Sequence, residues 1–484
     1  MYTFFFYSIL LLHPSISSDG VQYFSWIHAP IIHGNLNFTE EYTNSALKAW
    51  VPSVEIKTPT GLVNNIFFVG SPLMNAPFFL FGHFISYISG LPTNGYTDIY
   101  FLSYDFGTIF YSFIGSWIIF IILTKYLGFK KSDSMITVLL LISATPLISY
   151  IFVEPSFSHG DSYFAVSLLT LIWLKYRNEN NLKYWAYMGL CIGLIFLIRF
   201  EGIVFVLLPI FDLILNKKDT IKNYFRTTIN SIAYLSSMLL AFSPQIVFWK
   251  IVYGKLIPIP MPIEQYYQEA NYTRATYMDW NRPHVADFFF SAKHGLISWH
   301  PLFALLLSGY YFLFQKYRRI AIISVIMCIV VFYMLAAPWD WWGGWAFGQR
   351  RIALILPILS FALVAIIDKI GHSNLKSKII KATILISFSF WNMILLIQWL
   401  LTPEKDMPFD FFNQVIPNYA KSYQYLTWIL KQNYIMWQIN HSSEIGVEFI
   451  AIMFLVFVIP TIIMLTVFIY DTYRHKSKIN QETN

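Results

Sequence analysis

Long apolar segments separated by short polar breaks run along most of the chain. Because a helix needs about 20 apolar residues to cross the hydrocarbon core of a bilayer, each long segment is a candidate transmembrane helix. Only 12% of the 484 residues are charged, far fewer than a soluble surface of this size needs. The pattern predicts an all-α, polytopic membrane protein with spans at about 3–16, 103–124, 134–152, 161–175, 184–200, 202–215, 228–248, 296–315, 320–337, 350–368, 380–400 and 446–470.

The apolar segment 67–88 is a thirteenth candidate. Pro72 and Pro77 are predicted to break it, because proline removes a helical hydrogen bond and clashes with the preceding turn. We therefore expect this segment to lie on the outer face as a re-entrant or interfacial helix. A full crossing would move the later basic clusters to the outside, against the usual charge bias of membrane proteins.

Lysine and arginine placement then sets the orientation. With twelve spans, 20 of the 33 basic residues and only seven of the 26 acids fall on one face, which is predicted to be cytoplasmic. The net charge of +7 is therefore an insertion signal and does not indicate nucleic-acid binding. We expect an integral protein of the bacterial inner membrane with both termini cytoplasmic. A signal peptide at the N-terminus is disfavoured because no basic residue precedes the first apolar segment.

The chain is predicted to form a single membrane-embedded domain over residues 1–484, with outer loops at 17–66, 249–295 and 401–445. The first loop is expected to contain two short amphipathic helices, around Val21–Ile32 and Thr39–Ala49, at the membrane surface. Cys191 and Cys328 lie inside apolar segments and are interpreted as buried packing residues.

Candidate catalytic acids occur in two outer segments. Asp19 follows the first span, where a carboxylate could abstract a proton at the membrane boundary or simply cap the next helix. The short turn that includes Glu154, His159 and Asp161 is explained equally well by turn chemistry or by a site shared with Asp19. Such acids could act on an acceptor or hold a divalent cation, so the metal requirement stays open.

Arginines are predicted at the same boundary. Arg199 could bind a substrate, but a structural pair with Glu201 is slightly favoured. Arg350 and Arg351 lie on the outer side at the start of a span, against the positive-inside bias. Their guanidinium groups suit a lipid-linked phosphate on an otherwise acidic face. Trp342 precedes them in a tryptophan-rich segment that is also typical of an interfacial belt.

The loop 249–295 combines tyrosines, tryptophan and arginines and leads into a segment with Lys293, Trp299 and His300. Aromatic side chains of this kind stack on sugar rings or lie against lipid, and composition does not separate the two. We include Lys293, Trp299, His300 and Trp342 among the candidate substrate-binding residues, together with His159.

These segments, in this order, resemble the GT-C superfamily of polytopic glycosyltransferases, with bacterial relatives of protein O-mannosyltransferases and aminoarabinose transferases most similar. The matching motifs are Asp19-Gly20-x-x-Tyr23, Gly70-Ser71-Pro72-Leu73-x-x-Ala76-Pro77-Phe78, Ser158-His159-Gly160-Asp161, Gly295-Leu296-Ile297-Ser298-Trp299-His300-Pro301 and Trp342-x-Gly344-x-x-Phe347-Gly348-Gln349-Arg350-Arg351. Each is short. The paired acids typical of the mannosyltransferases are absent, since Gly20 follows Asp19.

The resemblance implies transfer of a sugar from a polyprenyl-phosphate donor to a glycan, lipid or protein acceptor outside the membrane. It implies that Asp19 is catalytic and that Asp161 or Glu154 is a second acid. The alternatives are a transporter or flippase for a lipid-linked saccharide, and an O-antigen-type polymerase or ligase. Transport is disfavoured because the polar groups gather at one boundary and no repeated halves are visible.

Overall fold

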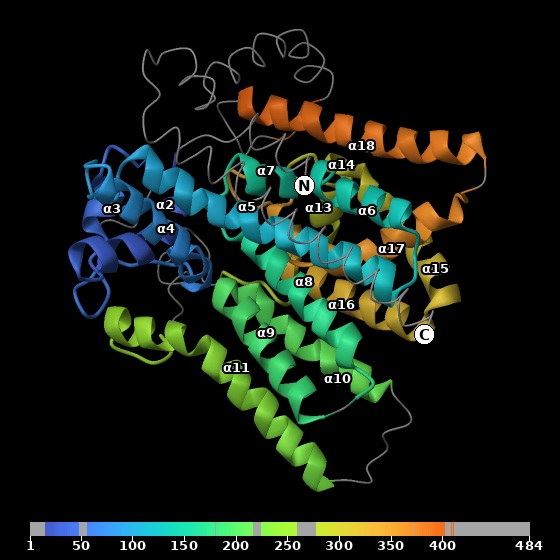
Figure 1. Cartoon of the computed structure of the whole chain (residues 1–484), viewed down its shortest axis with the longest axis horizontal. Coiled ribbons are helices and arrows are strands. Elements are labelled where there is room, and N and C mark those ends of the chain that lie inside the picture. Colours follow the sequence, from blue (N-terminus) through green and yellow to red (C-terminus); the bar gives the residue numbers. More distant parts are fainter. Residues whose placement is uncertain are drawn as a thin grey trace, which may run out of the picture.

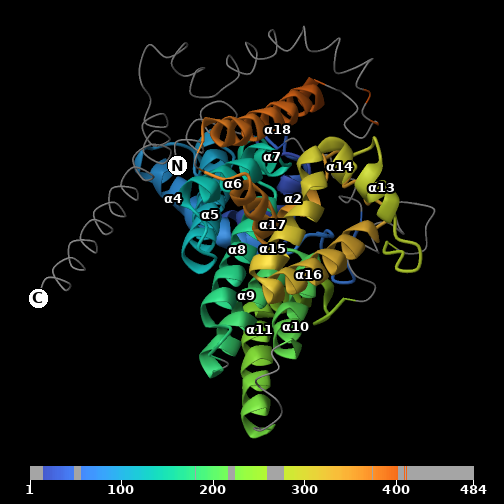
Figure 2. The ribbon, with the colours of Figure 1, turned by 90° about the vertical axis from the view of Figure 1, so that its right-hand side faces the viewer.

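The computed structural model describes residues 15–47, 56–179, 181–215, 224–258, 277–372 and 374–401, together with residues 408 and 410. Almost all of the predicted first span, the whole of the last span and nearly all of the outer loop 401–445 lie outside these residues. The described part is helical and contains no strand beyond two isolated bridges. Figures 1 and 2 show helices packed side by side, and in Figure 1 α2 (Asp19–His28), α3 (Thr39–Thr43) and α4 (Gly70–Ile88) gather at one end.

The long helices follow the predicted spans. They are α5 (Asp98–Ile121), α8 (His159–Tyr176), α9 (Leu182–Ile198), α11 (Tyr224–Tyr253), α16 (Arg318–Ala336), α17 (Leu356–Lys369) and α18 (Leu375–Leu401). In the described part of the chain, four helical segments are long and apolar enough to cross a membrane: Asp98–Tyr126, Thr228–Tyr253, Arg318–Ala336 and Leu375–Leu400.

Four predicted spans are not single helices, and here the prediction of continuous spans was wrong. The segment 134–152 divides into α6 (Lys131–Ser143) and α7 (Leu147–Phe152) because Pro146 cannot continue the first helix. The segment 296–315 divides at Pro301 into α14 (Leu296–Trp299), a 3₁₀ turn over Pro301–Leu305 and α15 (Leu306–Lys316). The other two begin as 3₁₀ turns, Phe200–Val206 before α10 (Leu207–Ile214) and Arg350–Leu354 before α17.

Helix α4 is continuous, so the prediction that Pro72 and Pro77 break it was also wrong. Pro72 lies in the first turn, where the missing N–H has no helical partner to lose, and Pro77 is accommodated inside the helix. The helix runs antiparallel to the first half of α5. Tyr111 donates a hydrogen bond to the Met74 carbonyl at one end of the contact, and the His83 and Tyr100 side chains bond at the other. Because α5 extends well past this contact, α4 covers only part of its length.

Helices α9 and α11 pack closely through two glycines. A Cβ atom added to Gly189 would lie 2.2 Å from the Tyr234 carbonyl oxygen, and one added to Gly193 would lie 2.4 Å from the Met238 carbonyl oxygen. Glycines four residues apart put one bare face on a helix, which lets the neighbouring backbone approach. This Gly-x-x-x-Gly pattern therefore fixes the spacing of the two helices that lie together in the lower part of Figure 1.

The first outer loop is more deeply packed than predicted. Helix α2 continues through a π-helical turn, Ala29–His33, and matches the predicted helix around 21–32. However, every residue from Gly20 to His28 is buried, because α2 packs against α4 and α5 in a second hydrophobic core. It is therefore not an amphipathic helix with one face on the membrane surface. The predicted helix around 39–49 is reduced to the five residues of α3, with residues 48 and 49 outside the described part.

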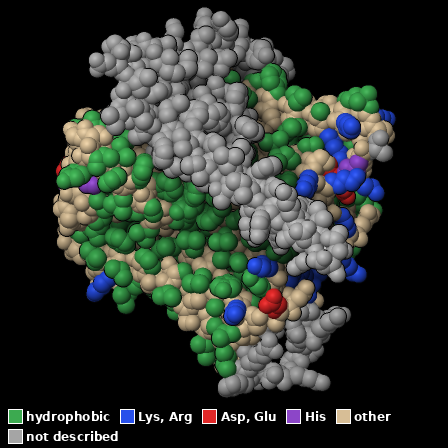
Figure 3. Space-filling view, in the orientation of Figure 1, with side chains coloured by type: hydrophobic (Ala, Val, Ile, Leu, Met, Phe, Trp, Pro, Cys, Tyr) green, Lys and Arg blue, Asp and Glu red, His purple; other side chains and the backbone are tan. Residues whose placement is uncertain are grey.

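Segments that carry basic residues meet in the described part of the chain. Three segments of the face predicted to be cytoplasmic meet: Lys316 lies 4.0 Å from the centre of the Phe129 ring, and the Lys381 ammonium lies 2.5 Å from Asp133. Figure 3 shows lysine and arginine side chains gathered near one edge of the molecule, away from the end where α2 and α3 lie, with a broad apolar surface between. Exposed apolar surface of this extent is typical of a lipid-facing protein.

Candidate active site

A cavity of about 200 Å³ lies where seven segments of the chain meet. Its walls carry charged, aromatic and aliphatic side chains. The lining residues come from the start of α2, the segment before α4, the turn before α8, the end of α9, the segments around 277 and 338–340, and the 3₁₀ turn before α17: Asp19, Tyr23, Ile66, Phe67, Phe68, Phe157, His159, Ile198, Arg199, Phe200, Glu201, Tyr277, Met278, Pro338, Asp340, Arg350 and Arg351.

Asp19 and Arg350, 331 residues apart, form an ion pair in this cavity. The Arg350 Nη1 donates to Asp19 Oδ2 at 2.6 Å, and both side chains are mostly shielded from solvent. Asp19 is the first residue of α2, and Ser18 before it has a positive φ of 51°. Gly20 presses against Ser156, since an added Cβ would lie 2.1 Å from the Ser156 hydroxyl. The second carboxylate of the mannosyltransferase motif would therefore not fit after Asp19.

Arg351 is held by a different acid. Its Nη2 donates to both carboxylate oxygens of Asp340, at 2.9 and 2.8 Å, and to the Tyr277 hydroxyl at 3.1 Å. Its Nη1 donates to the Asp340 carbonyl at 3.2 Å. The two tandem arginines are thus unlike: Arg351 is fixed by several bonds, whereas Arg350 has a single ion pair among the described residues.

Arg199 completes the set of cavity cations. Its Nη2 donates to Glu201 at 2.8 Å, which confirms the predicted pair, and its Nη1 donates to the Ser158 hydroxyl at 3.1 Å. Ser158 in turn hydrogen-bonds the Tyr23 hydroxyl at 2.7 Å. Burial acts to raise the pKa of the Glu201 carboxyl, but the Arg199 and Arg351 guanidiniums outweigh it and the net pKa is lowered.

His159 and Tyr23 remain neutral near pH 7. Burial lowers the pKa of the His159 imidazole well below its ordinary value, and the nearby Arg199, Arg350 and Arg351 guanidiniums lower it further. Burial raises the pKa of the Tyr23 phenol to about 12, although Arg199 opposes this. Three arginines and three acids line the cavity. With His159 and Tyr23 neutral, the side chains of the cavity carry no net charge.

Asp161 and Glu154, either of which the sequence allowed to share a site with Asp19, do not line this cavity. Asp161 is buried behind it, where the Ser71 hydroxyl donates to Oδ2 and the Asn75 amide donates to the same oxygen at 3.1 Å. The reason is helical geometry: Asp161 lies in the first turn of α8, and its side chain points toward α4. Glu154 lies in the turn before α8, outside the lining.

Four predicted substrate-binding residues also lie elsewhere. Lys293 stacks on Trp342, with its ammonium 3.9 Å from the ring centre. Trp299 is buried and donates from its indole to the Ala292 carbonyl, and His300 is buried against Gly348. These side chains pack the segment that supports the arginines. They pack around the site and do not line the cavity.

The sequence interpretation missed several lining residues. Asp340 is the partner of Arg351, Glu201 had been predicted only as a structural partner of Arg199, and Tyr277 lies in a loop that had been noted only for its composition. A cation near the membrane boundary needs an acid, so Asp340, 11 residues before Arg351, could have been identified from the sequence. The apolar wall residues Phe67 and Phe157 carried no such signal, because aromatic residues are common throughout the chain.

The cavity acids do not form a metal-binding group in the described part of the chain. Asp19, Glu201 and Asp340 each face an arginine. The two groups of histidine and acidic side chains whose ligand atoms lie close enough together to hold an ion are in other places, around His28 and around Asp133. A divalent cation in the cavity thus stays an untested expectation.

Comparison with known proteins finds similarity to a mannosyltransferase family and to the fold of ArnT. Residues 100–249 match the sequence model of the Dolichyl-phosphate-mannose-protein mannosyltransferase family. The fold is similar to that of ArnT from Cupriavidus metallidurans, which was crystallised with undecaprenyl phosphate. The two are 12% identical, with a TM-score of 0.52 over 94% of this chain and 74% of ArnT. No curated protein sequence matches significantly.

A second solved structure with similarity is the archaeal oligosaccharyltransferase AglB from Archaeoglobus fulgidus, in complex with an inhibitory peptide and a dolichol-phosphate. It is 13% identical, with a TM-score of 0.42 over 82% of this chain and 55% of AglB. Residues 100–249 thus resemble a mannosyltransferase family in sequence, and the fold of the chain resembles that of ArnT.

Proposed function

We propose that this protein transfers a sugar from a polyprenyl-phosphate donor to an acceptor hydroxyl at the extracytoplasmic membrane boundary. The observation that carries the proposal is the Asp19–Arg350 pair in a cavity with both charged and aromatic walls. The matched family is described as using a dolichyl-phosphate-linked sugar, and the ArnT structure holds undecaprenyl phosphate. Both are phosphates on long isoprenoid chains.

Arg350 is the residue best suited to bind the phosphate. A guanidinium group has five N–H donors, and Arg350 pairs with a single carboxylate among the described residues. Arg351, by contrast, is held by Asp340 and Tyr277 and serves to position the segment. A phosphodiester entering the cavity would compete with Asp19 for Arg350, and the aromatic side chains of Phe67 and Phe68 offer an apolar surface for the carrier chain.

This competition gives Asp19 its role. When the phosphate takes over Arg350, the carboxylate loses its ion pair and becomes available as a base. The acceptor oxygen attacks the anomeric carbon and its proton passes to Asp19, while the bond from that carbon to the phosphate oxygen breaks with its electron pair. Negative charge lost at Asp19 then appears on the leaving phosphate beside Arg350. A single displacement of this kind inverts the anomeric centre.

The proposal is tested with purified protein and a panel of polyprenyl-phosphate sugars, separating kcat from the KM for the donor. Asp19→Asn is expected to lower kcat about 10²–10⁴-fold, the usual contribution of a general base. Arg350→Ala is expected to raise the donor KM strongly. Arg318→Ala, which removes an exposed arginine far from the cavity, is the matched control and is expected to leave both unchanged.

Full activity in Asp19→Asn would rule out the assigned base, and full activity in Arg350→Ala would rule out the phosphate clamp. A flippase would move the intact lipid-linked saccharide between leaflets without cleaving it. A polymerase or ligase would require a lipid diphosphate-linked glycan. Including that donor, and following cleavage of the sugar–phosphate bond, therefore separates the three functions.

A further inference from the structure

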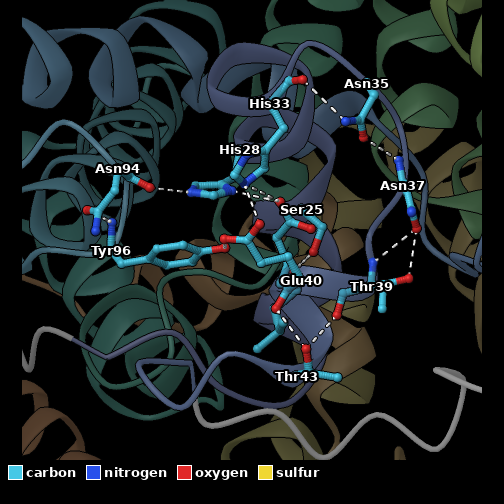
Figure 4. A network of polar contacts seen from close by, with 12 residues as sticks. Ser25, His28, His33, Asn35, Asn37, Thr39, Glu40, Thr43, Asn94 and Tyr96 are labelled. Carbon is cyan, nitrogen blue, oxygen red and sulfur yellow. Dashed lines mark hydrogen bonds and ion pairs between the residues drawn. The ribbon is translucent and has the colours of Figure 1, made fainter.

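The first outer loop contains a second polar cluster, on the opposite end of α2 from Asp19. His28, the last residue of α2, lies with its Nδ1 2.7 Å from Glu41 Oε1. The His33 Nε2 lies 3.2 Å from Glu40 Oε2 and 3.8 Å from Glu41 Oε1. Figure 4 shows His28 and His33 above Glu40, with Asn94 and Tyr96 approaching from a different segment.

The backbone brings the two imidazoles together. In an α-helix, side chains five residues apart point in different directions, but residues 29–33 form a π-helical turn. This wider turn leaves the rings of His28 and His33 with centroids 5.2 Å apart. Helix α3 then supplies Glu40 and Glu41 as consecutive residues from the other side.

One atom of this cluster is unexplained by the protein alone. Glu41 is fully buried, and its Oε2 has no hydrogen-bond partner among the described residues. A buried carboxylate without full compensation is costly, so such groups are normally paired or bind a cation. The cations within ion-pairing distance of Glu40 and Glu41, in the part of the chain that the structure describes, are histidines.

His28 is oriented as a metal ligand. Its Nε2–H donates to the Asn94 carbonyl at 2.9 Å, and its Nδ1 lies 2.7 Å from Glu41 Oε1, where a proton bridges the two atoms and a bound metal would replace it. Gly95 makes this approach possible, because a Cβ there would lie 2.3 Å from the His28 Nε2. The Tyr96 hydroxyl donates to Glu40 Oε1 at 3.2 Å, so the second carboxylate is also held from behind.

We infer that His28, His33 and Glu41, whose ligand atoms all lie within 4.8 Å of one another, bind a zinc-like transition-metal ion. Donor atoms around a tetrahedral zinc, with bonds of about 2.0–2.2 Å, lie about 3.4 Å from one another. The His28–Glu41 and His33–Glu41 separations, 2.7 and 3.8 Å, lie on either side of that value. Two imidazoles with carboxylates suit zinc and its neighbours, whereas magnesium and calcium prefer oxygen ligands alone.

The second histidine–acid group in the molecule provides a contrast. At Asp133, Asp368 and His372, the Lys381 ammonium already lies 2.5 Å from Asp133 and 3.2 Å from the His372 Nδ1. A lysine therefore supplies the positive charge there. The His28 cluster has the same kind of ligands without that ammonium among the described residues.

A metal in this place would join α2, the π-helical turn and α3. Because α2 also carries Asp19 and Tyr23 at its other end, the ion would brace the helix that presents the proposed base. The site is structural in this respect, because it lies at the far end of α2 from the cavity that holds Asp19.

The test measures bound metal in protein purified without a polyhistidine tag, stripped with a chelator, incubated with ZnCl₂ and desalted. Elemental analysis is expected to give about one zinc per wild-type chain, and His33→Ala or Glu41→Gln at least tenfold less. His33 is exposed, so removing it spares the core and keeps the variant folded. His372→Ala, at the lysine-containing group, is expected to keep the zinc, and MgCl₂ is expected to give no retained metal.

Zinc is also expected to raise the melting temperature of the wild type but not of His33→Ala. Wild-type protein that retains no more zinc than His33→Ala, or that shows the same melting temperature with zinc and with chelator, would overturn the inference. Because metal content and melting are read without sugar transfer, they can be measured in Asp19→Asn protein. A failure of the proposed function is therefore distinguishable from a failure of the metal site.

Discussion

At the scale of single residues, the cavity is a set of matched charges with one uncharged imidazole among them. Arg199, Arg350 and Arg351 each have an acid, and their combined field, added to burial, keeps His159 neutral. Neutral imidazole can donate or accept a hydrogen bond without adding charge to a site that must admit an anion. Because the folded protein keeps His159 neutral, this residue destabilises the folded state at acidic pH.

The sign of this effect follows from proton linkage. An unfolded chain protonates His159 below its ordinary pKa of 6.5, while the folded protein does not, so folding becomes less favourable as the pH falls. One proton corresponds to about 1.4 kcal/mol per pH unit. We expect His159→Gln to flatten the fall in melting temperature between pH 6.5 and pH 5.

The measurement compares the two proteins in detergent by thermal unfolding across pH 5–9. Above pH 8 the imidazole is neutral in both states, so the difference between wild type and variant is expected to be constant there and serves as the internal control. Parallel curves over the whole range would contradict a depressed pKa at His159.

At the scale of elements, glycines decide how closely the helices approach. The Gly189 and Gly193 positions on α9 face the α11 backbone, whereas Leu190 on the same helix is exposed. Close packing through small residues replaces the hydrophobic effect as the main source of association between helices in lipid. The ends of α9 and of the segment after it carry Arg199 and Glu201, so this packing also sets one wall of the cavity.

We expect Gly193→Ile to separate α9 from α11. Because the side chain forces two backbones apart, the destabilisation is expected to exceed the value of about 1–3 kcal/mol that is typical of overpacking. Gly193→Ala is expected to cost about 1–3 kcal/mol. Leu190→Ile introduces the same side chain at an exposed position one turn away and is the control. Melting temperatures in detergent give the comparison, and equal values for Gly193→Ile and Leu190→Ile would refute this account of the packing.

At the scale of the whole molecule, the arrangement separates two faces. The cavity and the His28 cluster lie with α2 and α3, while the segments that carry Lys316, Lys381 and Asp133 meet elsewhere. A transferase that uses a lipid-linked sugar outside the cytoplasm needs its site at one boundary, reached from one side. The predicted orientation has the basic segments inside and the α2–α3 loop outside.

Cysteine labelling tests this orientation, because Cys191 and Cys328 are buried and give little background. Asn35→Cys, at an exposed position in the first outer loop, is expected to react with a membrane-impermeant maleimide in intact cells. Arg318→Cys is expected to react only after the membrane is opened. The reverse pattern would show that the basic face is outside and would place the proposed site in the cytoplasm.

The sequence by itself determined the class of the protein and the position of most long helices. Apolar length and the scarcity of charge are local properties, so α5, α8, α9, α11, α16 and α18 follow the predicted spans closely. The same reasoning found Asp19, Arg199 and Arg350, because an ionisable group at a membrane boundary is conspicuous in an apolar sequence. It also predicted the Arg199–Glu201 pair, whose members are near neighbours in the chain.

Only the tertiary structure decided which of these groups meet. Asp161 lies in the same short segment as Glu154 and His159. Its position in the first turn of α8 directs its carboxylate toward Ser71 and away from Asp19. Arg350 and Arg351 are adjacent, but Arg350 binds Asp19, 331 residues away, whereas Arg351 binds Asp340, 11 residues away. Pairing across hundreds of residues depends on how helices pack and rotate, and neither property is written in the local pattern of apolar and polar positions.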